Sequence, residues 1–201
     1  MKLNDLLNRP EGSSLTFGDD NAETRQRLRE LILYITEKCA DDPNFGSTKL
    51  NKILYFSDFV SFRDRGRPIT GARYMRWDNG PMPKHLKPVT LEMIQEGILA
   101  REVHQANTYT QIRFIPKRGS HHEIFSEDDL DLVDAIIEEL KHHNATDVSL
   151  KTHGRVWRLT ENGDDLPYEA IFVSDAGLSE DAYEWARHLV AKHDKEWRAE
   201  G

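Results

Sequence analysis

The chain has 201 residues, of which 38% are hydrophobic and 31% charged, with a formal net charge of −8. This apolar content supports a real core and excludes wholesale disorder, while no run approaches the ~18 apolar residues that span a bilayer. The single cysteine, Cys39, excludes an internal disulfide and a CxxC metal site. The apolar part of the N-terminus is too short and too polar for a secretory signal. A reduced cytoplasmic setting without membrane contact is therefore expected.

The N-terminal part combines turn-forming segments with amphipathic helices. Residues 1–20 are expected to form a flexible arm, because Pro10, Gly12, Ser13, Ser14 and Gly18 break any pattern. The spacing of apolar residues predicts a helix over residues 22–39. A second helix is expected from Ser47 or Thr48, both good N-caps, to about residue 63. Because this helix is apolar on nearly all its sides, it is predicted to lie in the middle of a domain.

Residues 64–83 are dense in turn formers and cannot form one long helix. A third helix beginning at Pro83 or Pro88 is expected to run to about residue 96, with Leu91 and Ile94 inside. The remaining predicted elements are the two arms of a β-hairpin over 98–103 and 108–115, and helices over 127–142, 150–159 and 179–197. Ser126 and Asp129 are expected to form a variant capping box.

These elements predict a mainly α fold with a small β-hairpin, in the α+β class. Three parts are expected. They are the flexible arm at 1–20, a compact helical domain at 21–175, and a C-terminal helix at 176–201 packed on that domain.

Charge is unevenly distributed. Residues 61–120 carry 11 Lys and Arg against 5 Asp and Glu, whereas residues 121–201 carry 8 against 20. This pattern indicates a basic side and an acidic side. The order of a helix followed by a hairpin resembles the end of a winged helix, and Lys117 and Arg118 could contact phosphates. A DNA-binding autorepressor is therefore one hypothesis, although the acidic third argues against a large duplex footprint.

The usual catalytic signatures are absent from the sequence, which has no HExxH, no GxSxG, no P-loop and no GxGxxG opening a helix. Adjacent histidines such as His121 and His122 point in different directions, so no metal site is expected. The acidic residues between Asp128 and Glu139 lie opposite an apolar stripe and are interpreted as a solvated face. We therefore expect no catalytic residues, no cofactor and no enzymatic activity.

Four blocks follow one another along the chain. They are KLNKILYFSDF (Lys49–Phe59), GRPITGARYMRWDNGPMP (Gly66–Pro83), SLKTHGRVWRL (Ser149–Leu159) and LPYEAIF (Leu166–Phe172). In this order they resemble the Panacea domain of the SocA-like antitoxin family. The motif positions are Lys49, Leu50, Pro68, Gly71, Gly80, Pro81, His153 and Trp157.

The resemblance implies a mostly helical Panacea-like domain over 21–175 with a small β element. It also implies an antitoxin that neutralises a toxin, usually encoded by an adjacent gene, through direct contact. Some relatives are described as adaptors that deliver the toxin to a protease, so a protease is a further possible partner. The family has no agreed catalytic residues to transfer.

The second block is the expected working surface. Pro68 and Gly71 bracket one chain reversal and Gly80 with Pro81 makes another. The rigid loop between them is expected to present Trp77 as an anchor, since aromatic residues dominate binding hot spots. The candidate toxin-binding residues are Arg76, Trp77, Asp78 and Asn79 of this loop, and Tyr55, Phe59 and Phe62 on the aromatic side of the preceding helix, for which burial in the core is the favoured alternative.

Overall fold

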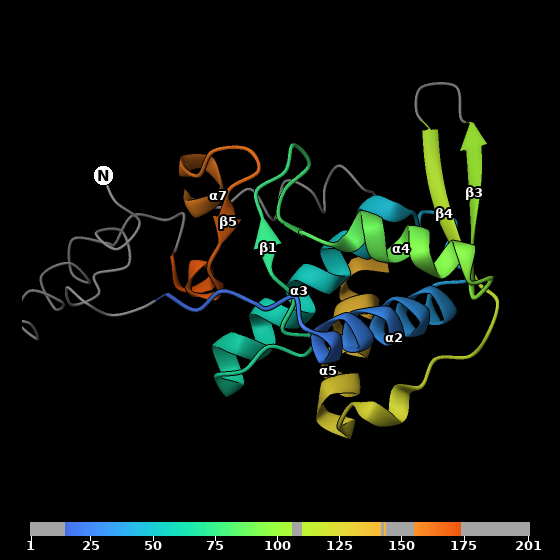
Figure 1. The fold of residues 1–201 in the computed structure, drawn as a ribbon, viewed down its shortest axis with the longest axis horizontal. Helices are drawn as coiled ribbons and strands as arrows, with labels where there is room; N and C mark the ends of the chain where they lie inside the picture. The colour runs from blue at the N-terminus through green and yellow to red at the C-terminus, as the bar shows by residue number, and fades with distance from the viewer. Residues whose placement is uncertain (1–14, 106–109, 142, 144–154, 174–201) are drawn as a thin grey trace, which may run out of the picture.

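The computed structural model of the chain describes residues 15–105, 110–141, 143 and 155–173. It shows a helical body with a projecting β-hairpin and a small three-stranded sheet (Figure 1), which confirms the predicted mainly α fold of the α+β class. The elements are α2 (Ala22–Lys38), α3 (Ser47–Arg65), β1 (Tyr74–Met75), β2 (Met82–Pro83), α4 (Leu86–Gln95), β3 (Leu99–Gln105), β4 (Thr110–Pro116), η1 (His122–Ile124), α5 (Glu127–Lys141), α7 (Arg155–Leu159), β5 (Asp165–Leu166) and η2 (Tyr168–Phe172).

Helix α3 is the central element, in contact with α2, α5 and η2, so its predicted place in the middle of the domain is confirmed. It begins at Ser47, one of the two predicted starts, but neither Ser47 nor Thr48 is its N-cap. The residue that caps it is Gly46, which offers no side-chain cap to the first-turn N–H groups. The helix ends at Gly66, whose φ of 73° is the left-handed conformation typical of a helix end.

A three-stranded antiparallel sheet of order β2-β1-β5 holds the segment at residues 66–83. Tyr74 of β1 pairs with Pro83 on one side and with Leu166 on the other. Each strand has only two residues, which is too short to show an alternating pattern, so the sequence does not predict this sheet. Gly80 has a φ of 101°, as expected of the turn between β1 and β2.

Helix α4 and the hairpin form one side of the body. The helix begins at Leu86 and not at Pro83, because Pro83 is paired in β2. Leu91 is 55% exposed, so its predicted place inside the core is wrong. The reason is that α4 buries only the face that packs against α2 and β3, and Leu91 lies off that face. The hairpin extends from Leu99 to Pro116 and projects from the helices (Figure 1).

Helix α5 begins with the predicted capping box. The Asp129 N–H donates to the Ser126 Oγ at 3.2 Å, and the Ser126 N–H donates to the Asp129 carboxylate at 3.4 Å. The interpretation of the acidic residues as a solvated face is wrong for Asp129, which is 2% exposed. Its carboxylate accepts hydrogen bonds from Arg65 at 3.0 Å and from Arg67 at 3.1 Å, because the end of α3 packs there.

Several predicted features lie outside the described residues, namely residues 1–14, His153 and the helix expected over 179–197. Helix α7 is the described end of the helix expected over 150–159. The described end of the N-terminal arm contacts η2, where the Thr16 N–H donates to the Glu169 carboxylate at 3.0 Å.

Cys39 is a small buried side chain, and burial raises the pKa of its thiol to about 12. Among the residues that the structure describes, no helix has the length and apolar character needed to cross a membrane. Within the same residues, no group of three or more His, Cys, Asp or Glu side chains is placed to hold a metal ion.

Candidate functional site

The first two sequence blocks form one structural unit, in which polar side chains of α3 hold the loop at residues 66–83. The buried Asp58 carboxylate accepts hydrogen bonds from the Thr70 N–H at 2.6 Å, from the Thr70 hydroxyl, and from the Tyr74 hydroxyl at 2.9 Å. A buried carboxylate without such partners would be very costly. Asp58 therefore fixes the first turn of the loop to the central helix.

Two further α3 side chains hold the second turn of the loop. Lys52 Nζ donates to the carbonyl oxygen of Asn79, and Asn51 Nδ2 donates to the carbonyl oxygen of Pro81 at 2.9 Å. Lys52 is fully buried. These contacts explain why polar residues occur on a helix that is buried on nearly all its sides.

Burial shifts the pKa of both charged residues toward the neutral form. Desolvation raises the pKa of Asp58 to about 6, although the hydrogen bonds from Thr70 and Tyr74 act in the opposite direction. Desolvation also lowers the pKa of Lys52 to about 7. The network that holds the loop therefore contains two groups that titrate near neutral pH.

The motif residues Lys49 and Leu50 join α3 to its neighbours. Lys49 Nζ lies 2.7 Å from the Asp42 carboxylate and donates to the carbonyl oxygen of Lys141 at 3.1 Å. Lys49 is 1% exposed and Leu50 is fully buried. Both residues therefore belong to the framework and not to an accessible surface.

The aromatic side of α3 faces the core. The ring centroid of Phe59 lies 5.1 Å from that of Tyr74 and 4.9 Å from that of Tyr168, and Phe62 stacks on Tyr168 at 5.3 Å. Phe59 is fully buried, Tyr55 is 9% exposed and Phe62 is half-buried. Burial removes Tyr55 and Phe59 from the candidate toxin-binding surface, because other aromatic rings cover them.

Helix α7 packs against the loop at residues 66–83 through Trp157. Trp157 Nε1 donates to the carbonyl oxygen of Trp77 at 3.1 Å, and the Arg76 guanidinium lies 4.6 Å from the centroid of the Trp157 ring. Arg76 and Trp77 are half-buried, whereas Asp78 and Asn79 are exposed. The loop thus presents only part of its expected surface, since α7 covers the rest.

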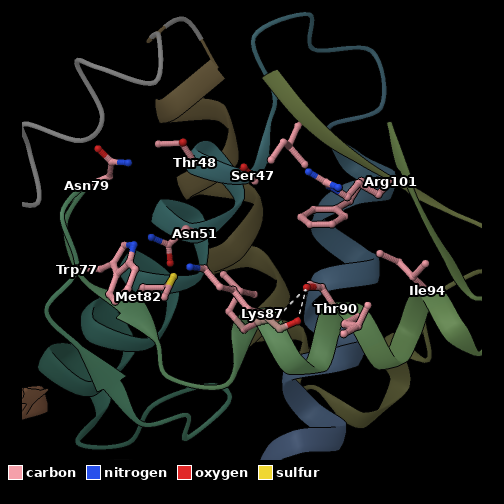
Figure 2. A pocket seen from close by; sticks show the side chains of 14 residues that line it. Ser47, Thr48, Asn51, Trp77, Asn79, Met82, Lys87, Thr90, Ile94 and Arg101 are labelled. Carbon is pink, nitrogen blue, oxygen red and sulfur yellow. Dashed lines mark hydrogen bonds between the residues drawn. The ribbon is translucent and has the colours of Figure 1, made fainter. Parts of the chain in front are cut away.

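A cavity of about 430 Å³ opens beside the loop, between α3, α4 and the hairpin. Figure 2 shows Trp77 and Met82 on one side of it, with Ile94 and Arg101 on the other. We call it the α4–hairpin groove. Its apolar lining consists of Trp77, Met82, Leu86, Leu91, Ile94, Ile112 and Phe114, and its polar lining of Ser47, Thr48, Asn51, Asn79, Lys87, Thr90 and Arg101.

Sequence reasoning named Trp77 and Asn79 of this groove but missed the residues of α4 and the hairpin. One signal was present, because Leu91 falls outside the spacing of Val89 and Met93, which are buried. The hairpin residues gave no such signal, since their contribution depends on how the hairpin packs against α4.

Some cations of the basic central segment form ion pairs with carboxylates outside that segment. At these places opposite charges from different elements meet, which reduces the positive charge that this segment presents to a partner. The ion pairs are Arg65 and Arg67 with Asp129, Arg73 and Lys84 with Asp165, and Arg118 with Glu30.

The comparisons with curated proteins and with solved structures found no match. A family model described as antitoxin SocA-like, Panacea domain, matches residues 50–158. This range begins in α3 and ends in α7, so it includes the loop and all the groove-lining residues except Ser47 and Thr48. Because the match spans more than half of the 201 residues, the chain belongs to the SocA-like antitoxin family with a Panacea domain.

Proposed function

We propose that this protein is the antitoxin of a toxin–antitoxin system and neutralises its toxin by direct protein–protein contact, without catalysis. The observation that carries the proposal is membership of an antitoxin family over residues 50–158. The expected partner is the product of an adjacent gene. The proposal needs no cofactor and places the protein in the cytoplasm with its toxin.

The α4–hairpin groove is the proposed site of contact with the toxin. Its lining is mainly apolar, and Leu91 at its edge is 55% exposed. Uncovered apolar surface of this kind marks sites of interaction in proteins. Among the loop residues, Trp77 lines the groove and is the proposed anchor, whereas Arg76 lies over the Trp157 ring.

Co-expression tests the proposed function. The product of the adjacent gene, expressed alone, should arrest growth, and co-expression of this protein should relieve the arrest. The two proteins should also co-purify. A growth arrest that this protein does not relieve, together with absence of co-purification, would contradict the proposal. Toxin half-life in strains with and without each major protease would then separate plain occlusion from delivery to a protease.

The alternative of a DNA-binding autorepressor receives less support from the contacts of the hairpin. Arg118 pairs with Glu30 at 2.6 Å, and Arg113 donates to the carbonyl oxygens of Ala40 and Asp42 at 3.0 Å. These cations are held by protein groups, which lowers their value as phosphate contacts. A salt-sensitive gel shift with the upstream DNA of the operon would restore the alternative.

A further inference from the structure

We infer that the α4–hairpin groove binds one short extended peptide segment of the toxin, in which a large apolar side chain lies next to a carboxylate. This inference rests on the proposed function and deepens it, because it names the chemistry of the partner and the surface that receives it. Three observations carry it, concerning the shape, the charge and the hydrogen bonding of the groove.

The shape and lining of the groove suit a bulky apolar side chain. Its volume of about 430 Å³ is large enough for a few side chains and too small for a folded domain. Trp77 and Met82 form one wall and Ile94 part of the other (Figure 2). An aromatic or aliphatic side chain that enters would be enclosed by apolar atoms, which is the arrangement typical of binding hot spots.

The charge of the groove is opposite to that of the chain. The whole chain has a net charge of −8, yet the groove lining contains Lys87 and Arg101 and no acidic residue. Lys87 Nζ lies 4.4 Å from the centroid of the Trp77 ring, and neither cation pairs with a carboxylate of the described residues. The start of α3 at Ser47, which has no side-chain cap, also faces the groove and favours negative charge.

An unpaired hydrogen-bond acceptor indicates a peptide. Asn51 is 8% exposed, and its Nδ2 is held by the carbonyl oxygen of Pro81, so its Oδ1 is left as the free atom of the amide. No described group donates to this Oδ1. A buried acceptor without a partner is costly, and a backbone N–H of an extended segment would satisfy it. In Figure 2 the Asn51 side chain lies within the groove, between the Trp77 side and Lys87.

An extended peptide supplies all three features together, since its main chain alternates donors with acceptors and its side chains provide the apolar and acidic groups. A nucleic acid matches less well, because the mainly apolar lining has two cations, which can neutralise only a small part of a phosphate backbone.

Site-specific photocrosslinking with the full chain and its toxin tests where the contact lies. A photoreactive phenylalanine analogue at Leu91 places the probe at the edge of the groove. The same analogue at Leu159 of α7, which is 57% exposed, is the matched control. Crosslinking to one toxin segment from Leu91 and not from Leu159 is expected, and mass spectrometry should identify a segment with an apolar residue beside Asp, Glu or a terminal carboxylate. Crosslinking from Leu159 alone, or to a segment without a carboxylate, would overturn the inference.

Binding of a synthetic peptide with the crosslinked sequence then tests the chemistry. Arg101→Glu should weaken its affinity at least about tenfold, since the substitution replaces an attraction to the carboxylate by a repulsion. Lys117→Glu makes the same charge change at an exposed position outside the groove and should leave affinity nearly unchanged. Leu91→Asp should weaken binding similarly and Leu159→Asp should not. Equal effects of Arg101→Glu and Lys117→Glu would overturn the inference.

The two proposals fail in different ways. If this protein relieves the growth arrest and the Leu91→Asp and Arg101→Glu variants do so equally well, the groove is not the site but the antitoxin function stands. If the wild-type protein neither relieves the arrest nor co-purifies with the toxin, the antitoxin function itself is contradicted.

Discussion

Asp58 and Thr70 are joined twice, because the Asp58 carboxylate accepts a hydrogen bond from the Thr70 N–H at 2.6 Å and another from the Thr70 hydroxyl. Both residues are buried, at 0% and 2% exposure. The contact attaches the loop at residues 66–83 to the central helix. This loop forms one wall of the α4–hairpin groove. The position of that wall therefore depends on a buried polar contact that lies outside the groove lining.

Removal of the Asp58 carboxylate should destabilise the protein. Asp58→Ala leaves the Thr70 N–H and the hydroxyls of Thr70 and Tyr74 buried without their acceptor, which costs at least about 2 kcal/mol of unfolding free energy. Urea unfolding measures this loss. Asp131→Ala, at an exposed position of α5, is the control and should leave the unfolding free energy unchanged. Equal unfolding midpoints for the two variants would contradict the prediction.

The raised pKa of Asp58 predicts a pH dependence of stability. The carboxyl titrates near 3.9 in an unfolded chain, and burial raises the pKa of Asp58 to about 6 in the folded protein. Between these values the folded state holds a proton that the unfolded state has released. The resulting stabilisation is present below about pH 4 and is lost as pH rises through about 6, by roughly 3 kcal/mol at most.

Asp58→Asn isolates this effect, because asparagine does not ionise in that range. The unfolding free energy of the wild type minus that of Asp58→Asn should fall between pH 4 and pH 7 in urea titrations. A difference that stays constant or rises across this range would show that Asp58 is not the titrating group.

Lys52 predicts the opposite slope at higher pH. A lysine titrates near 10.4 in an unfolded chain, and burial lowers the pKa of Lys52 to about 7 in the folded protein. Between these values the unfolded chain holds a proton that the folded state has released, so the unfolding free energy should rise with pH. The wild type minus Lys52→Met difference should increase from pH 7 to pH 10, and Lys117→Met controls for loss of an exposed lysine. A flat difference would contradict the assignment.

Asp129 should be essential to the junction of α3 and α5. Its carboxylate is 2% exposed and pairs with Arg65 and Arg67. Asp129→Ala would remove the carboxylate that pairs with both guanidinium groups and that accepts from the Ser126 N–H, with a cost of about 3 kcal/mol. Thermal unfolding measures the effect against Asp131→Ala on the same helix. A melting temperature like that of the control would contradict the prediction, because it would mean that water replaces the carboxylate as partner of the arginines without loss of stability.

Trp77 and Phe59 should separate binding from folding. Phe59→Ala removes a fully buried ring and should cost about 3–5 kcal/mol of stability, with loss of toxin binding as a consequence of unfolding. Trp77→Ala removes the wall of the groove but keeps the backbone carbonyl that accepts from Trp157. It should stay folded by circular dichroism and lose co-purification with the toxin. Unfolding of Trp77→Ala to the same extent as Phe59→Ala would assign Trp77 to the core.

Local signals were sufficient to predict helices α2, α3 and α5 and the capping box of α5. The Ser126–Asp129 box and the central place of α3 follow from residues that are neighbours along the chain. The family also follows from the order of the sequence blocks, which the match over residues 50–158 confirms. These features are local because helix periodicity, capping and turn formation each involve only a few consecutive residues.

The partners of polar residues were decided only by the tertiary structure. The sequence predicted Asp129 on a solvated face, yet its buried carboxylate accepts hydrogen bonds from Arg65 at the end of α3 and from Arg67 in the loop that follows. It likewise gave no sign that Asp58 and Lys52 would hold a loop. The α4–hairpin groove belongs to the same class, since Trp77, Leu91 and Arg101 come from three separate elements. The hydrogen-bond partner of a polar residue and the lining of a cavity depend on which segments pack together in space. The residue pattern along one segment does not determine this packing.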